Sequence, residues 1–343
     1  MQRINWIDWM KMMCMTGVIF IHLPQNEDTF YLSYIGAVVL TPFFFISGIL
    51  SKQGLSQKEL LKKYSYSLLI PYILYNAVFY PYWFIKFYID HEGVITLMDC
   101  IKPVVGTILL QLNSAISSEL NAITWFLPAL FLMHWITGTC CQLKHGKMVM
   151  IILIIITILL YGANKYYHYA PNLTFNGFVR SLVFFFAGYI CQGSKWLKNC
   201  SLQKDFCIGI TSFVFSLVIF YWHINESHIV LHIFLYYVVC TLALMGIILL
   251  CKFVNNLRIH LITLIAVGTI VILGLQNILI GIINYGLEKT LHIPDISYNW
   301  YECVILAIAI EAILIPVIIT CRNRFPIFLG KKPTVQKVEP TKA

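Results

Sequence analysis

Charged residues are scarce in this sequence. Only 11% of its 343 residues are Asp, Glu, Lys or Arg, whereas about 25% is usual in a soluble domain. Hydrophobic residues make up 59%, and the mean hydropathy is +0.78. The composition excludes an ordinary soluble domain. Because the apolar residues are spread along the chain, it predicts one polytopic membrane domain over residues 1–330.

Motifs that would bind metal or form disulfide frameworks are also missing. Most of the eleven cysteines lie in or beside apolar segments, where Cys behaves as a small hydrophobic residue. There is no C-x-x-C pair and no His/Cys cluster with zinc-ligand spacing. We therefore expect no disulfide framework and no metal.

A basic net charge of +9 does not indicate nucleic acid here, because the charges lie in short loops between apolar runs, as in membrane proteins. We expect no nucleic-acid partner, and membrane lipid as the surroundings of the protein. The first apolar stretch contains Asp8 and Lys11 and has no small-residue cleavage site, so it does not read as a signal peptide. The polar segment 331–343 is expected to be a disordered cytoplasmic tail.

Ten apolar stretches approach the roughly 20 residues that a helix needs to cross a bilayer. The shorter run 101–112 is expected to be an interfacial or re-entrant piece. The sequence therefore predicts an all-α, polytopic membrane helix bundle, with spans at 5–23, 30–50, 66–89, 122–142, 147–163, 178–193, 206–222, 229–251, 261–285 and 300–321.

Loop charges set the predicted orientation. With the N-terminus inside, most of the 24 Lys and Arg residues fall in inner segments and most acidic residues fall in outer loops, as the positive-inside rule requires. Both termini are therefore predicted to be cytoplasmic. The expected location is a cell membrane, taken to be the bacterial inner or plasma membrane.

Three ionisable residues lie in the first span: Asp8, Lys11 and His22. Eleven residues at 100° each amount to three turns plus 20°, so Lys11 and His22 share one helix face, about 16.5 Å apart along the axis. Asp8 lies one turn before Lys11. Charge inside a membrane usually marks function, but Lys11 can also extend to the interface beside Asp8, and His22 can simply end the helix.

Several segments together resemble the integral-membrane acyltransferases of acyltransferase family 3, which transfer acyl groups to sugars. The stretch "RINWIDWMKMMCMTGVIFIH" is similar to the first helix of that family, in which an Asp shortly precedes an Arg, followed by ten residues and a His. Further similar segments are "TPFFFISGILSKQ", "LLKKYSYSLLIPYILYN", "AITWFLPALFLMHWI" and "RSLVFFFAGYI", in family order.

Two positions depart from the family pattern. Lys11 stands where Arg is usual, which keeps the charge but loses the planar, bidentate guanidinium. Gln276 and Asn277 stand where many members have a late His, so no role is carried to that site.

The resemblance implies acyl transfer from a cytoplasmic acyl-CoA, with acetyl-CoA as the expected donor, to a hydroxyl of a surface polysaccharide or lipid-linked saccharide. It implies that His22 is the base or the acyl carrier, that Lys11 binds the donor, and that Asp8 supports Lys11. Lys62 and Lys63, with Lys52 and Lys58, can meet the nucleotide phosphates, although topology alone also explains basic inner loops.

Acceptor-binding candidates lie in other spans. Arg180, near the outer end of the sixth span, can bind an acidic or hydroxylated acceptor, with extension to the interface as an equal alternative. Trp125 and the tyrosine-rich third span can stack on sugar rings, but interfacial aromatic residues explain them as well. Glu311 should point inward, because a lipid-facing carboxylate is costly; the sequence suggests no role for it.

A second function class remains open at this point. The chain can be a multi-pass transporter or exporter of glycans or lipid-linked sugars, with Asp8, Lys11 and His22 as a proton relay; a scaffold or sensor is a third possibility. Transporters often show paired, Gly/Pro-interrupted helices, whereas Pro42, Pro71, Pro81 and Pro128 cluster in the first half. Release of CoA from acetyl-CoA distinguishes the enzyme from the alternatives.

Overall fold

A computed structural model describes residues 4–26, 30–169, 172–198, 202–292 and 296–332. Its regular structure is helical, and only isolated bridges represent β-pairing in these ranges. The predicted tail 331–343 lies, apart from its first two residues, outside the described part of the chain. The all-α bundle predicted from the sequence is confirmed.

The first half of the chain forms helices α1 to α7, with two short non-α turns. A π-turn over Ser65–Leu69 joins α4 to α5, and a 3₁₀ turn over Ala122–Trp125 leads into α7. The helices are α1 (Asn5–Phe20), α2 (Phe30–Val38), α3 (Thr41–Ile49), α4 (Gln57–Tyr64), α5 (Ile70–Asp90), α6 (Leu97–Ile108) and α7 (Phe126–Cys140).

The second half continues in the same style and ends in a 3₁₀ turn, Pro326–Leu329. Its helices are α8 (Gly146–Tyr166), α9 (Leu173–Ile190), α10 (Lys195–Lys198), α11 (Leu202–Ile224), α12 (Ile229–Phe253), α13 (His260–Val267), α14 (Thr269–Leu291) and α15 (Trp300–Asn323).

Nine helical segments of the described residues are long and apolar enough to cross a membrane, so the protein is a multi-pass membrane protein. They correspond to nine of the ten predicted spans. The remaining predicted span, 5–23, forms α1, which at 16 residues is shorter than a typical span of about 20. Residues 101–108 of the short run 101–112 belong to α6, and residues 109–112 follow the helix.

Two predicted spans are interrupted helices. The span 30–50 breaks between α2 and α3 at Val39 and Leu40, directly before Pro42, which occupies the first turn of α3. Proline lacks an N–H and clashes with the preceding turn, so the break follows from the sequence. The span 261–285 breaks at Gly268, between α13 and α14.

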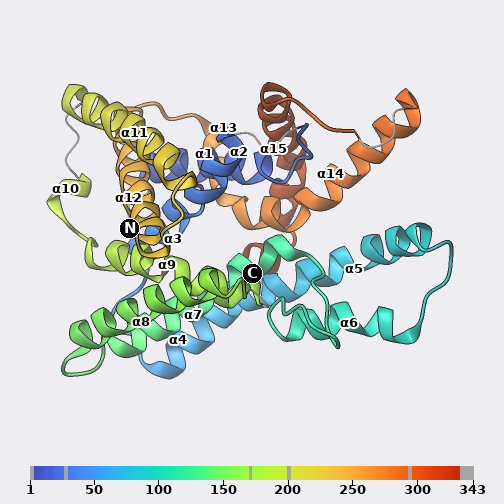
Figure 1. The fold of residues 1–343 in the computed structure, drawn as a ribbon, viewed down its shortest axis with the longest axis horizontal. Coiled ribbons are helices and arrows are strands. Elements are labelled where there is room, and N and C mark those ends of the chain that lie inside the picture. Colours follow the sequence, from blue (N-terminus) through green and yellow to red (C-terminus); the bar gives the residue numbers. More distant parts are fainter. Residues whose placement is uncertain (1–3, 27–29, 170–171, 199–201, 293–295, 333–343) are drawn as a thin grey trace, which may run out of the picture.

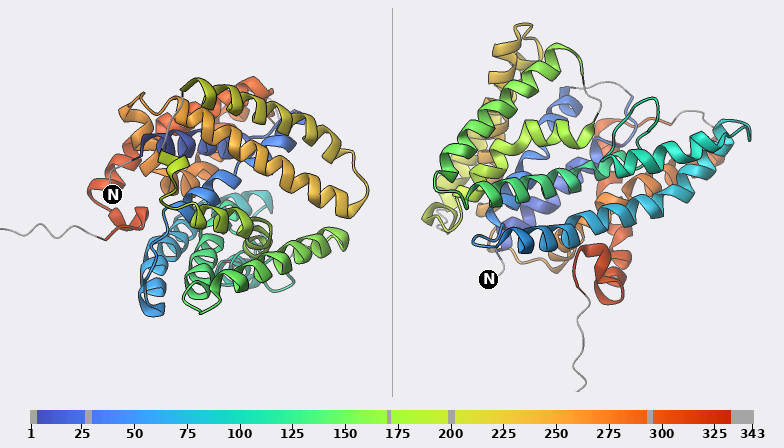
Figure 2. Two further views of the ribbon diagram at one scale, coloured as in Figure 1. Left: turned by 90° about the vertical axis from the view of Figure 1, so that its left-hand side faces the viewer. Right: turned by 90° about the horizontal axis from the view of Figure 1, so that it is seen from below.

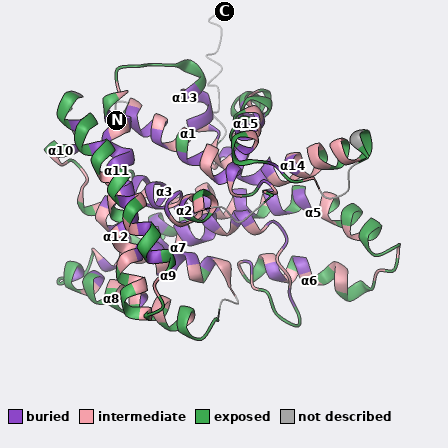
Figure 3. Cartoon of the chain, turned by 45° about the horizontal axis from the view of Figure 1, so that its top comes forward, coloured by how far each residue is buried: buried purple, intermediate pink, exposed green. Residues whose placement is uncertain are grey.

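Helix α1 lies in the middle of the bundle. It contacts α2, α3, α12, α13, α14 and α15, and Figures 1 and 2 show these helices around it, with α11 and α12 packed together on one flank. Figure 3 shows buried residues concentrated on α1 and α3, while α8 and α11 are largely exposed at the periphery. Exposed apolar side chains on the outer helices face lipid.

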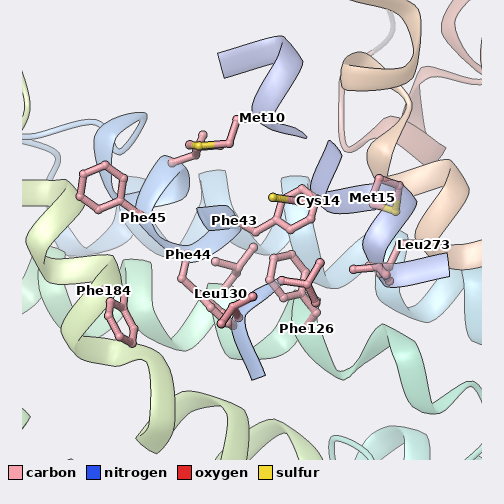
Figure 4. Close-up of a cluster of buried hydrophobic side chains, with 14 of the residues drawn as sticks. Met10, Cys14, Met15, Phe43, Phe44, Phe45, Phe126, Leu130, Phe184 and Leu273 are labelled. Carbon is pink, nitrogen blue, oxygen red and sulfur yellow. The ribbon is translucent and has the colours of Figure 1, made fainter. Parts of the chain in front are cut away.

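Aromatic side chains of α3 fill the centre of the core. Figure 4 shows Phe43, Phe44 and Phe45 between the methionine-rich face of α1 and the side chains of α7 and α9. Phe44 and Phe126 have ring centroids 5.0 Å apart. The core therefore packs α1 and α7 against α3.

Helices α3 and α9 touch through their backbones. A Cβ on Gly48 would collide with the carbonyl oxygen of Phe185, and a Cβ on Gly188 would collide with that of Phe45. Gln192, just after α9, donates hydrogen bonds to the carbonyl oxygens of Gly48 and Ser51 at 2.7 and 2.9 Å. The C-terminal end of α3 is thus held directly to α9.

Candidate active site

His22 lies in the turn that ends α1. Its Nδ1 is 2.6 Å from the carbonyl oxygen of Val18. A carbonyl oxygen can only accept, so this contact requires a proton on Nδ1 and leaves Nε2 as the nitrogen that can take up a proton. The tautomer suits a general base or a nucleophile that acts through Nε2.

The chain after His22 is held by the segment that precedes α15. Tyr298 N donates to Pro24 O at 2.9 Å, and Asn26 N donates to Tyr298 O at 3.2 Å. Gln25 Nε2 reaches back to Phe20 O at 3.0 Å. These bonds fix where His22 stands relative to the other helices.

His22 lines a cavity of about 540 Å³, a volume within the range of small-molecule sites. Helix α5 and helix α14 form its walls, and Leu120 contributes from the loop before α7. The polar lining includes an ammonium group, a carboxylate and two carboxamides, and the aromatic lining comes from α5. The side chains that give the cavity its character are Phe79, Tyr82, Trp83, Lys86, Phe87, Asp90, Asn277 and Asn284.

A buried carboxamide network supports one side of this cavity. Asn76 Oδ1 accepts hydrogen bonds from Gln111 Nε2 at 3.1 Å and from the backbone N–H of Asn121 at 3.2 Å. Asn121 Nδ2 donates to Gly274 O at 2.9 Å, and Asn277 Nδ2 lies 3.4 Å from Asn121 Oδ1. The network joins three parts of the chain: α5, α14 and the loop that precedes α7. The loop backbone is irregular and buried, and polar groups buried at membrane depth need hydrogen-bond partners.

Asp8 and Lys11 lie on α1, as predicted, with Asp8 buried. The same face continues through Met15 and Val18, both buried, before it reaches His22. Packed apolar side chains therefore separate the two ends of the predicted stripe. A donor arm that follows this face needs Met15 and Val18 to move.

Comparison with known families identifies the family of the chain. The family model of the acyltransferase domain of acyltransferase family 3 matches residues 4–321 of this chain. The chain belongs to this family of membrane acyltransferases. No curated protein and no solved structure matches it.

Two of the predicted basic residues of the acyltransferase, Lys52 and Lys63, lie near the C-terminal end of α3. Tyr64 OH accepts from the backbone N–H of Lys52 and from Lys63 Nζ, both at 3.2 Å. Its ring stacks on His134 with centroids 3.9 Å apart, and His134 Nδ1 lies 2.9 Å from Ser51 Oγ. Tyr64 therefore contacts the ammonium group of Lys63 and the backbone N–H of Lys52.

The other two predicted lysines, Lys58 and Lys62, are exposed on α4. Neither lies among the residues of the His22 cavity. The structure therefore separates the predicted basic set into a pair that shares Tyr64 and a pair on the helix surface.

Arg180 of the acyltransferase lies among tyrosines of neighbouring helices. Its guanidinium carbon is 6.0 Å from the ring centroid of Tyr236 on α12, and the Tyr237 hydroxyl donates to its backbone oxygen at 3.2 Å. Within the described ranges, Arg180 Nε is buried without a hydrogen-bond partner. Arg180 does not line the His22 cavity.

Trp125 does not line the His22 cavity but packs against neighbouring helices. Its ring occupies the space above Gly177, where any Cβ would collide with it, and it lies 6.4 Å from the Phe44 ring. The aromatic residues that do line the cavity come from α5. Tyr82 belongs to the tyrosine-rich third span, and Trp83 follows it directly.

Two buried polar residues lie near the centre of the acyltransferase. Glu311 is 2% exposed, points inward as expected, and its Oε1 is 3.1 Å from Thr16 Oγ1 on α1. Gln276 is fully buried, and neither polar atom of its side chain has a partner among the described residues. It precedes the cavity-lining Asn277 on α14.

Sequence reasoning missed most of the cavity lining. Lys86 and Asp90 are one helical turn apart on α5, which was a usable signal for a shared polar face. Asn284 had no local signal, because its position opposite α5 depends on the packing of α14. Among the described residues there is no group of three or more His, Cys, Asp or Glu side chains that could hold a metal.

Proposed function

We propose that this protein transfers an acetyl group from acetyl-CoA to a hydroxyl of a cell-envelope carbohydrate. Membership of a membrane acyltransferase family sets the reaction class. The observation that carries the proposal is the His22 side chain, whose Nδ1–H is held by Val18 O while the residue lines a cavity.

The reaction needs a proton acceptor at the sugar hydroxyl. His22 Nε2 takes the hydroxyl proton as the oxygen attacks the thioester carbon, and the C–S bond then breaks. The thiolate leaves and takes the proton back from the imidazolium, giving CoA as the free thiol. In the other order, Nε2 attacks the thioester carbon, the C–S bond breaks, and the CoA thiolate leaves the acetyl group on Nε2. The hydroxyl oxygen then attacks this acetyl group, the C–N bond breaks, and the hydroxyl proton goes to the thiolate, which gives CoA as the free thiol and restores the imidazole. Nε2 is the reacting atom in both routes.

The cavity lining suits a carbohydrate. Tyr82 and Trp83 offer ring faces to the apolar face of a sugar, while Lys86, Asp90 and Asn284 offer donors and acceptors to its hydroxyls. Polar groups make up about half of the lining, which suits an acceptor that carries several hydroxyls as well as an apolar ring face.

The donor is proposed to bind at the cytoplasmic side. Lys52 and Lys63, which both hydrogen-bond to the Tyr64 hydroxyl, supply positive charge for the nucleotide phosphates, and Lys serves phosphate as a point charge. We assign Lys11 to the donor as well, because it is a cation on α1, three helical turns before His22.

The transporter alternative has less support. A proton relay along α1 needs polar groups or water at hydrogen-bonding distances, and Met15 and Val18 are buried on that face between Lys11 and His22. The intervening axial distance is about 16.5 Å, which is several hydrogen bonds long.

The test is acetyl transfer by the purified protein in proteoliposomes, with acetyl-CoA labelled in its acetyl group and envelope glycan as acceptor. We expect label in the glycan and equimolar CoA release. Label on the protein when acceptor is omitted would indicate the acyl-His22 route. No CoA release with or without acceptor would reject the enzyme and favour the transporter.

A further inference from the structure

A second cavity adjoins the His22 cavity along α5. It lies between α5 and α6, also measures about 540 Å³, and is lined almost entirely by apolar groups. Tyr72, Ile73 and Ala77 form one wall, and Val104 and Ile108 form the other. We call it the α5–α6 groove; the two helices lie side by side in Figures 1 and 2.

Two tyrosines of α5 join the walls of the groove through hydrogen bonds to α6. The Tyr72 hydroxyl donates to Thr107 O at 2.6 Å, and the Tyr80 hydroxyl donates to Cys100 O at 3.1 Å. Thr96 and Asp99 form a capping box at the start of α6, and their hydrogen bonds hold the pKa of Asp99 below its ordinary value. The groove is therefore built by fixed contacts.

The groove is open at the surface of the helix bundle. Ile73 is 59% exposed on α5 and Ile108 is 72% exposed on α6, and both lie on the groove walls. A molecule that enters from the side of the membrane can reach it, whereas acetyl-CoA is water-soluble and is proposed to arrive from the cytoplasm.

The groove and the His22 cavity are adjacent. Leu120 lines both, and along α5 the groove lining ends at Tyr80 where the cavity lining begins at Phe79. The groove is lined mainly by apolar side chains, whereas the lining of the His22 cavity includes charged and carboxamide side chains. An amphiphile matches this change, with its chain in the groove and its head beside His22.

We propose that the acceptor is a lipid-linked saccharide whose hydrocarbon chain lies in the α5–α6 groove while its sugar occupies the His22 cavity. This inference rests on the proposed acetyl transfer to a carbohydrate. The groove places the sugar by holding its anchor, which lowers the orientational cost of bringing one hydroxyl to Nε2.

The chain offers a matched pair of variants for the test. Ile73 lines the groove and is 59% exposed, whereas Ile85 lies on the same helix, is 61% exposed, and lines neither cavity. Ile73→Trp narrows the groove, and Ile85→Trp makes the same change of volume on a lipid-facing surface.

Acetyl transfer in proteoliposomes is measured with dodecyl glucoside and with methyl glucoside, and the ratio of the two kcat/KM values is compared between variants. Partition into the bilayer is the same for every variant, so the ratio isolates the groove. We expect Ile73→Trp to lower the ratio at least tenfold with methyl glucoside turnover retained, and Ile85→Trp to stay within twofold of wild type. Equal ratios in the two variants would overturn the proposal.

A photoreactive dodecyl glucoside, with a diazirine at the chain end, gives a readout that needs no turnover. Its label should fall on α5 and α6 peptides, disappear in Ile73→Trp, and be suppressed by dodecyl glucoside more strongly than by phospholipid. Equal suppression by phospholipid would overturn the proposal, because the groove would then be a general lipid site. Acetyl transfer to envelope glycan without groove labelling would reject the groove alone and leave the proposed function intact.

Discussion

Replacing His22 by Asn separates catalysis from structure. The His22 ring makes one hydrogen bond with the backbone, from Nδ1 to Val18 O at 2.6 Å. The Asn carboxamide nitrogen branches from the same carbon as the imidazole Nδ1, so His22→Asn can keep this bond while it removes the basic Nε2. His22→Ala removes both.

The two variants should therefore differ in stability but not in activity. Loss of the hydrogen bond costs about 0.5–1.5 kcal/mol, which only His22→Ala should show. Loss of a general acid–base group costs about 10²–10⁴-fold in rate, equivalent to about 3–5 kcal/mol of transition-state stabilisation, and both variants should show it.

The assay is transfer of labelled acetyl groups from acetyl-CoA to envelope glycan, with thermal unfolding of the same preparations measured in parallel. We expect both variants to be at least a hundredfold slower than wild type, with His22→Asn melting near the wild-type temperature. Activity of His22→Asn within twofold of wild type would refute the catalytic assignment of Nε2.

Three other experiments test the donor end, the topology and the core. Lys11→Ala should raise the KM for acetyl-CoA, and Lys11→Arg should be tolerated because it restores the family's usual residue; equal loss of activity in both would reject donor binding. An impermeant maleimide should label Cys100 in intact cells, and a Cys introduced at Leu143 only after permeabilisation, as mass spectrometry of the peptides would show; the reverse would invert the predicted orientation. Gln276→Met should leave the melting temperature unchanged or raise it, because a buried carboxamide without a partner costs about 1–3 kcal/mol. A lowered melting temperature in the Gln276→Met protein would contradict this reasoning.

Hydropathy and charge predicted most of the fold because the bilayer imposes the length and composition of each span. The exceptions are local. Helix α1 is short, α2 and α3 are broken before Pro42, and α9 begins at Leu173, where the Asn172 side chain accepts from Phe175 N at 2.8 Å. Proline as a helix breaker and asparagine as a helix N-cap can be recognised in the sequence. An average of hydropathy over a window of residues hides both.

The candidate site was only partly predictable. The shared face of Lys11 and His22 follows from helix geometry alone. That Met15 and Val18 fill this face between them depends on the side chains that α1 meets in the bundle. The groups opposite His22 were beyond sequence reasoning, because Asp90 and Asn284 come together only through the packing of α5 and α14.

Aromatic candidates show the same limit. Trp125 and Tyr82 are both aromatic residues near predicted span ends, and nothing local distinguishes them. Packing places the Trp125 ring on Gly177 and the Tyr82 side chain in the cavity. Residue type indicated which side chains can stack on a sugar. It did not indicate which of them line the cavity and which pack against another helix.

The backbone contact between Gly48 and Gly188 has a consequence for donor binding. Ser51 and Lys52 follow α3 directly, and Gln192 ties this end of α3 to α9. The basic end that we assign to the nucleotide is therefore already rigid before any ligand arrives. A preorganised site loses little conformational entropy on binding. The entropy cost of ordering this region arises when α3 and α9 pack together during folding, and not when CoA binds. The affinity for CoA should therefore depend on the glycines of this helix contact, although the nucleotide does not touch them.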